Sequence, residues 1–176
     1  MARRAKSAKG PIEPDKPPPP AEKPRVPLLR LAEVLGQDRA IATLRASIAS
    51  GRIHHAWVFY GPDGVGKFTA ALAFAGVILD PTSAPDLSGN IEPDPRGRVR
   101  QLIADGNHPD LHIITKELAR YEAKKTVRDA KLITIPKDVM ETHLLGRVTD
   151  SGEVITGPVD LASSLPGGLV QKVFIV

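Results

Sequence analysis

The chain has 176 residues, of which 41% are hydrophobic, carries a formal net charge of +4 and contains no cysteine. The lack of cysteine excludes disulfide bonds, thiolate zinc sites and cysteine nucleophiles. No apolar run approaches the roughly 20 residues that a membrane-spanning helix needs, and the first residues have no apolar core of a secretion signal. We therefore expect a cytoplasmic protein that does not engage a membrane.

Proline and positive charge are concentrated at the N-terminus. Residues 1–30 hold eight of the 17 prolines and eight basic residues against three acidic ones, so the rest of the chain has a net charge of −1. Such a composition cannot bury enough apolar surface to offset the entropy of ordering. We predict a disordered, basic, proline-rich tail over residues 1–28 and a partial α/β domain over 29–176. The tail is either a solvated segment or an arm that touches DNA or a partner.

The pattern of apolar residues after the tail predicts alternating helices and strands. Ile41, Leu44 and Ile48 have helical spacing, which predicts a helix over 37–50 that ends at Gly51. The other predicted elements are a buried strand at 56–60, a helix at 66–79, a loop at 80–94, a helix at 95–105 that starts at Asp94-Pro95, a strand at 111–115, a strand or extended entry at 131–135, a helix at 137–145, an irregular or hairpin segment at 147–165 and a strand at 172–176. This alternation is typical of an α/β fold with a parallel sheet.

A glycine-rich segment between the strand at 56–60 and the following helix carries the most information. It has the order strand, glycine-rich loop, lysine, helix, which is typical of a phosphate-binding loop. Glycines let successive backbone N–H groups turn toward an anion, and the helix N-terminus adds positive potential. The nucleotide-binding residues that we predict here are Gly61, Pro62, Asp63, Gly64, Val65, Gly66, Lys67, Phe68 and Thr69.

This loop departs from the usual G-x-x-x-x-G-K-[ST] pattern at its last position. A hydroxyl that would hold Mg²⁺ is replaced by Phe68, and Thr69 comes one residue later, about 100° further around a helix. We therefore expect nucleotide binding with weak or no hydrolysis by this chain alone, leave Mg²⁺ open, and assign no catalytic residue. The alternative is a glycine turn with a solvated lysine.

Two other groups of polar residues are weaker candidates. His108, Asp110 and His112 resemble a zinc ligand set by composition, but turn and strand-edge roles explain them as well, and we predict no metal site. A basic run extends from Arg120 to Lys131, and Glu117, Tyr121, Lys124, Lys125 and Arg128 fall at helical spacings. They form either a DNA-facing helix or, by default, a solvated surface.

Segments outside the loop resemble one family. Residues 34–37 (VLGQ), 51–62 (GRIHHAWVFYGP) and 108–111 (HPDL), with the closing strand 172–176 (KVFIV), are similar to the ATPase domain of bacterial clamp-loader subunits, closest to the delta-prime type of DNA polymerase III, in the AAA+ class. The resemblance covers roughly residues 30–118 and 170–176. It implies a three-layer parallel-sheet P-loop domain, with Val34, Leu35 and Gly36 lining the adenine pocket and an insertion near 119–165.

The same resemblance carries expectations about function. It implies a subunit of a hetero-oligomeric clamp loader, part of the DNA polymerase III holoenzyme, that binds ATP and helps to place a sliding clamp on primed DNA. In such ATPases an acidic residue follows a strand like 172–176, so we expect a chain truncated before that motif; the alternative is a small complete domain whose last strand is apolar. Many relatives carry a four-cysteine zinc module after the P-loop helix, which this chain cannot form. The rival hypotheses are a P-loop nucleotide kinase and a scaffold that binds no nucleotide.

Overall fold

The structure is a computed structural model that describes residues 28–85, 87, 89–122, 125–128, 133–145, 147–148, 154–156, 165 and 168–176. The prediction for the tail therefore lies almost wholly outside the described residues. The elements in chain order are η1 (Leu31–Glu33), α1 (Asp38–Ala49), α2 (Lys67–Leu79), β1 (Ala84–Pro85), β2 (Ile91–Glu92), α3 (Arg98–Ala104), β3 (Leu111–Ile113), η2 (Lys116–Tyr121), α4 (Lys125–Arg128), α5 (Lys137–Met140), η3 (Glu141–Leu145), β4 (Arg147–Val148), β5 (Val154–Thr156) and β6 (Val173–Ile175).

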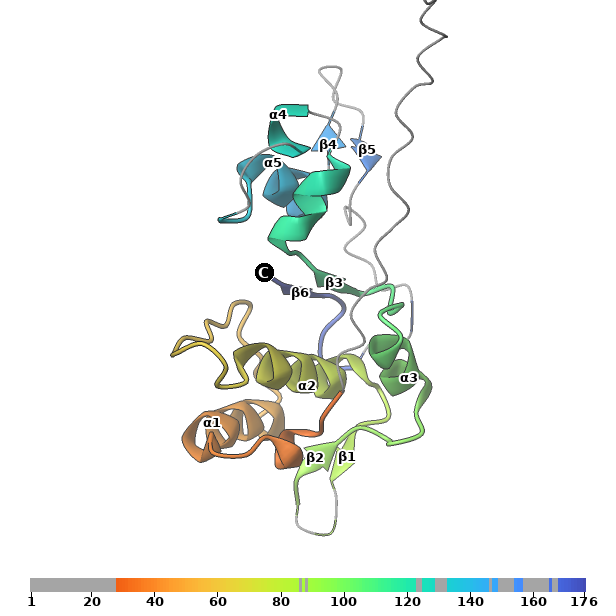
Figure 1. The fold of residues 1–176 in the computed structure, drawn as a ribbon. Coiled ribbons are helices and arrows are strands. Elements are labelled where there is room, and N and C mark those ends of the chain that lie inside the picture. Colours follow the sequence, from red (N-terminus) through yellow and green to blue (C-terminus); the bar gives the residue numbers. More distant parts are fainter. Residues whose placement is uncertain are drawn as a thin grey trace, which may run out of the picture.

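Helix α2 lies between α1 and a small parallel sheet (Figure 1). Strands β3 and β6 form this sheet, with Leu111 opposite Val173 and Ile113 opposite Ile175. Helix α3 packs against α2 near its C-terminal end, and the elements from η2 to β5 form a second lobe above the sheet (Figure 1). The observed content is thus α/β with one small parallel sheet among the described residues.

The two long helices match their predicted positions. Helix α1 buries Ile41, Leu44 and Ile48 on the face that the spacing indicated. Helix α2 is apolar on nearly all sides, and nine of its 13 residues are buried. One side contacts α1, and the other contacts α3 and β6, so a helix without a polar face is what this central position requires.

The prediction of a strand at 56–60 is wrong, because this segment forms no strand hydrogen bonds, although its side chains alternate as in a strand. Trp57 and Phe59 pack against the core between α1 and α2, while Val58 and Tyr60 are 85% and 91% exposed. The physical reason is the missing neighbour: among the described residues no strand lies alongside this segment to complete a ladder. The segment is therefore not the buried strand that its composition suggested.

Two further elements differ from prediction. Helix α3 begins at Arg98, because Asp94 closes a turn by accepting bonds from the N–H groups of Arg96 at 2.9 Å and Gly97 at 2.9 Å. Of the segment predicted as a strand or extended entry, residues 133–135 form no strand, and residues 131–132 lie outside the described part of the chain. The loop predicted at 80–94 contains the two-residue strands β1 and β2.

The insertion packs around its own apolar cluster. Ile114, Ala119 and Val139 are buried there, with Phe174 of β6 against them. Of the basic segment, Arg120 lies in the 3-10 helix η2 and Lys125 and Arg128 lie in the short α4, while residues 124 and 131 lie outside the described part of the chain. The backbone is extended at Glu122, so η2 and α4 are not one continuous helix. The helix predicted at 137–145 is α5 followed by the π-helical turn η3. Strands β4 and β5 pair antiparallel, which agrees with the hairpin alternative for the first part of 147–165; residues 149–153 and 157–164 lie outside the described part of the chain.

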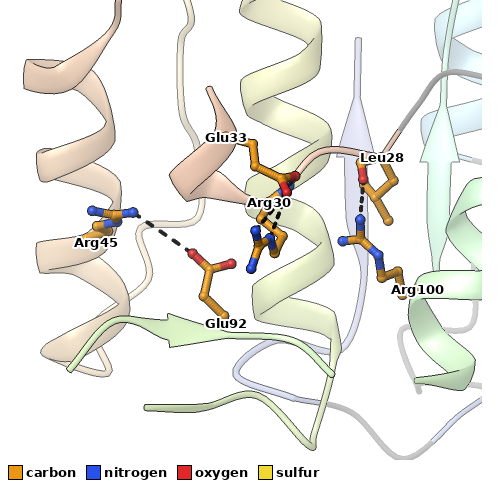
Figure 2. A network of polar contacts seen from close by, with 6 residues as sticks. All are labelled: Leu28, Arg30, Glu33, Arg45, Glu92 and Arg100. Atoms are coloured by element: carbon orange, nitrogen blue, oxygen red, sulfur yellow. Dashed lines mark hydrogen bonds and ion pairs between the residues drawn. The ribbon is translucent and has the colours of Figure 1, made fainter. Parts of the chain in front are cut away.

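Polar contacts tie the first described residues to the helical layer (Figure 2). The Arg100 guanidinium donates to the carbonyl of Leu28, and Leu28 itself packs beside Gly76 of α2. Glu33 accepts bonds from Arg30 at both its backbone and its side chain, and these bonds lower the pKa of the Glu33 carboxyl. Arg45 of α1 forms an ion pair with Glu92 of β2 at 4.0 Å, which joins the β1–β2 pair to α1.

Candidate functional site: a glycine-rich loop at the start of α2

The loop from Gly61 to Lys67 connects the extended segment 56–60 to α2. Gly64 and Gly66 have φ of 79° and 85°, in the left-handed region that glycine adopts without strain. A Cβ at either position would meet no atom within 4 Å, so the backbone angle, and not crowding, requires glycine there. The space beside both glycines is open, which is what close approach of a phosphate to the backbone requires.

Helix α2 begins at Lys67 directly after this turn. Gly66 is its N-cap, and the Gly66 carbonyl accepts the first helical bond from Ala70 N–H at 2.9 Å. The N–H groups of the first turn of a helix have no partner within the helix and carry the positive end of its dipole. The loop and helix together therefore provide the backbone donors that an anion site needs.

The Lys67 ammonium is folded over the loop. It donates to the carbonyls of Gly61 at 2.8 Å and Pro62 at 2.7 Å. The Asp63 carboxylate lies 3.8 Å away, and its side chain is fully exposed. The side chain of Lys67 thus bends back over the predicted loop and contacts acceptors of the loop itself.

The two residues after Lys67 take different environments. Phe68 is 37% exposed and lines an apolar groove, whereas Thr69 is half-buried. In the G-x-x-x-x-G-K-[ST] pattern, Phe68 stands at the position of the hydroxyl residue that holds Mg²⁺. The residues present fit a phosphate, and they lack the usual protein ligand for Mg²⁺.

The three residues predicted to line the adenine pocket, Val34, Leu35 and Gly36, lie in different environments. Val34 is half-buried and lines a cavity of about 390 Å³, with Leu31, Ile41 and Arg45 around it. Leu35 is 86% exposed, and Gly36 turns the chain with φ of 72°. The segment reaches the loop through the next residue, because Gln37 Nε2 donates to the Val65 carbonyl at 3.4 Å.

An apolar groove of about 770 Å³ lies beside the loop, between residues 53–59 and β6. Trp57, Phe59 and Phe74 form part of its lining, and Lys67 and Phe68 stand along it. Trp57 contacts Phe74 edge to face, with ring centroids 5.4 Å apart. The groove places apolar surface next to the charged end of α2.

The histidines named as possible zinc ligands belong to a buried polar cluster at the start of the sheet. Asp110 is 1% exposed; its N–H donates to His108 Nδ1 at 3.1 Å, and its carboxylate accepts from Leu165 N–H at 3.2 Å and lies 3.6 Å from Lys172 Nζ. His112 stacks on Phe174. Within the described ranges, no group of three or more candidate ligands is placed to hold a metal ion.

Burial lowers the pKa of both histidines. For His108 the carboxylates of Asp110 and Asp80 oppose this effect, and for His112 the positive charge of Lys172 reinforces it. Both rings therefore favour the neutral form, in which His108 Nδ1 can accept its hydrogen bond.

Three contacts were missed by reasoning from sequence. For the hydrogen bond from Gln37 to the loop, the sequence offers only a weak signal, namely a polar residue that follows a glycine just before a helix. The ion pairs Asp63–Lys67 and Asp110–Lys172 join residues four and 62 positions apart; the first is visible in the spacing, and the second depends on the sheet register.

Comparison with known proteins defines the family. The model of the family described as "DNA polymerase III, delta subunit" matches residues 36–146, which include the loop and most of the insertion. The chain belongs to this family.

Individual proteins of known identity resemble this chain over parts of its length. It is 40% identical over 107 residues to DNA polymerase III subunit delta' of Bacillus subtilis (strain 168), a match that covers 61% of this chain and 30% of that protein. It is 35% identical over 79 residues to subunit tau of Escherichia coli (strain K12), covering 41% of this chain and 12% of that protein. A 44-residue match to subunit gamma/tau of Mycobacterium tuberculosis (strain ATCC 25618 / H37Rv) is 46% identical and covers 25% of this chain and 8% of that protein.

These matches identify a delta-prime-like chain that spans less than a third of the length of the relatives it matches. No solved structure matches it. In the part of the chain that the structure describes, no helix is both long and apolar enough to cross a membrane.

Proposed function

We propose that this chain is part of a cytoplasmic clamp-loader subunit that binds ATP at the loop 61–69 and helps, with other subunits, to load a sliding clamp on primed DNA. The observation that supports ATP binding most directly is the loop itself, with left-handed Gly64 and Gly66 leading into α2 at Lys67. The names of the relatives support the replication role. We also propose that the small parallel sheet is part of a three-layer AAA+ domain.

In this proposal the residues of the chain have distinct tasks. The backbone N–H groups from Gly64 onward surround the phosphates, and Lys67 leaves the Gly61 and Pro62 carbonyls to contact the terminal phosphates. Val34 provides one apolar wall for the base. Phe68 cannot ligate Mg²⁺, so hydrolysis by this chain alone is weak or absent.

One alternative, a scaffold that binds no nucleotide, is favoured by two observations. The Lys67 ammonium already has acceptors within the loop, and Phe68 replaces the metal-binding hydroxyl. The kinase alternative has no such support, since the chain belongs to the DNA polymerase III delta family.

Equilibrium binding of a fluorescent ATP analogue separates these functions. Lys67→Ala removes charged hydrogen bonds to phosphate, worth about 1.5–3 kcal/mol, and should weaken binding about tenfold or more. The matched control is Lys137→Ala, a highly exposed lysine of α5 that should leave binding unchanged. Absence of binding by the wild-type chain, or equal binding by Lys67→Ala, would refute the ATP site.

The clamp-loader role needs a separate test. The gene product, tagged at its N-terminus and purified from its own cells, should copurify with gamma or tau subunits of DNA polymerase III. Copurification without any of these subunits would refute the assignment, whatever the result with nucleotide.

A further inference from the structure

The loop contains an acidic residue where a phosphate site is expected to be positive. Asp63 lies in the middle of the loop, four residues before Lys67. Its carboxylate forms an ion pair with the Lys67 ammonium, with Oδ1 3.8 Å from Nζ. An anion that binds Lys67 therefore meets a negative charge already in place.

The contacts of Lys67 define what an incoming anion must replace. An ammonium has three N–H donors. Two hydrogen bonds go to the carbonyls of Gly61 and Pro62, at 2.8 and 2.7 Å, and the Asp63 carboxylate lies on the same ammonium. The loop thus supplies the lysine with two hydrogen-bond acceptors, from residues 61 and 62, and with a counter-charge from residue 63.

We infer that Asp63 competes with phosphate for Lys67 and lowers the affinity of the loop for anions. This inference rests on the proposed function, because it concerns the same site. Asp63 does so in two ways: it holds the ammonium in the closed position, and it repels a polyphosphate by like charge. Because Phe68 supplies no metal ligand, Lys67 carries the charge compensation of the loop, and competition for it matters more.

The expected effect of Asp63 is modest because the pair is exposed. Exposed ion pairs contribute little, and with the added repulsion of a polyphosphate we expect Asp63→Asn to tighten binding about two- to tenfold at low salt. The gain should shrink as ionic strength rises, because solvent-exposed charges are screened. Asparagine keeps the shape of the side chain, and the full exposure of Asp63 leaves the fold unaffected.

The test compares Asp63→Asn with Asp105→Asn in the full 176-residue chain. Asp105 is exposed and follows the last residue of α3. Helix α3 packs against the C-terminal part of α2, whereas the loop precedes the first residue of α2 (Figure 1). Each variant removes one negative charge, so the two change the net charge equally. Binding of the fluorescent ATP analogue and of inorganic pyrophosphate is measured at low and high salt. Tighter binding by Asp63→Asn alone supports the inference, whereas equal binding by Asp63→Asn and the wild type, or an equal gain in Asp105→Asn, overturns it.

A second readout does not depend on nucleotide binding. The rate at which acetic anhydride modifies Lys67, followed by mass spectrometry of the peptide, reports how firmly the loop holds its amine. Asp63→Asn should raise this rate about twofold or more, as expected when a weak exposed ion pair is lost, and Asp105→Asn should not. If Asp63→Asn raises the rate of Lys67 acetylation but no ATP binding is found, the proposed function is refuted and the contact between Asp63 and Lys67 stands. If the acetylation rate does not change, the inference is refuted even if ATP binds.

Discussion

The buried ion pair between Asp110 and Lys172 allows a quantitative test of what holds the parallel sheet. The two residues stand immediately before β3 and β6, with Nζ and Oδ1 3.6 Å apart and side chains only 2% and 9% exposed. Lys172→Met keeps the apolar stem but removes the charge, so the buried Asp110 carboxylate loses its ion pair with Lys172. Such a change costs about 3–5 kcal/mol when nothing else compensates.

The loss should fall near the lower end of that range, at about 3 kcal/mol, because the Leu165 N–H still donates to the carboxylate at 3.2 Å. Urea unfolding followed by far-ultraviolet circular dichroism at pH 7.5 measures the change in free energy of unfolding. The matched control is Lys137→Met, which breaks the exposed pair with Glu141 at 3.2 Å. Exposed pairs are worth well under about 1 kcal/mol, so the control should change little.

The double variant Asp110→Asn, Lys172→Met should recover part of the loss, because it removes the uncompensated charge together with its partner. A loss below about 1 kcal/mol for Lys172→Met, or a double variant as unstable as the sum of the single ones, would refute the reasoning that this pair is a buried, coupled unit.

Two other outcomes are expected. Burial lowers the pKa of His108 and His112, so the unfolded chain takes up protons first: the free energy of unfolding should be steady above about pH 6.5 and fall as the pH drops from there toward the lowered pKa values. His108→Asn should flatten this fall in urea midpoints measured between pH 7.5 and 5.5, and an equally steep fall would contradict the assignment. Gly168→Ala should cost about 1–3 kcal/mol, because the new Cβ would lie 2.6 Å from the Ile78 carbonyl oxygen, which accepts a bond from Val170 N–H. A thermal midpoint equal to that of the wild type would show that residues 168–170 move aside without cost.

Local signals predicted most of the helical part. Ile41, Leu44 and Ile48 gave α1 its buried face, and the lysine after three glycines located the start of α2 within one residue. These features depend on residues close in sequence, where periodicity and glycine angles decide the outcome.

The failures concern pairing between distant segments. An apolar alternation at 56–60 predicts a strand, but a strand also needs a neighbour, and nothing in those five residues indicates whether one is present. In the same way, Asp110 and Lys172 meet because β3 and β6 lie in one register, which neither residue signals locally. At the candidate site, the sequence identified the loop but not the contacts that Lys67 makes within it.

The position of Trp57 in the groove beside the glycine-rich loop has a practical consequence. Trp57 is the only tryptophan of the chain, and its ring stands in the groove wall between Phe74 on α2 and His54, 5.6 Å from the imidazole. Indole emission changes with the polarity and the quenchers around it. Because Lys67 and Phe68 line the same groove, the protein carries an intrinsic optical reporter for changes at the start of α2. Nucleotide, a peptide in the groove or a shift of the glycine-rich loop can each be followed without any added dye.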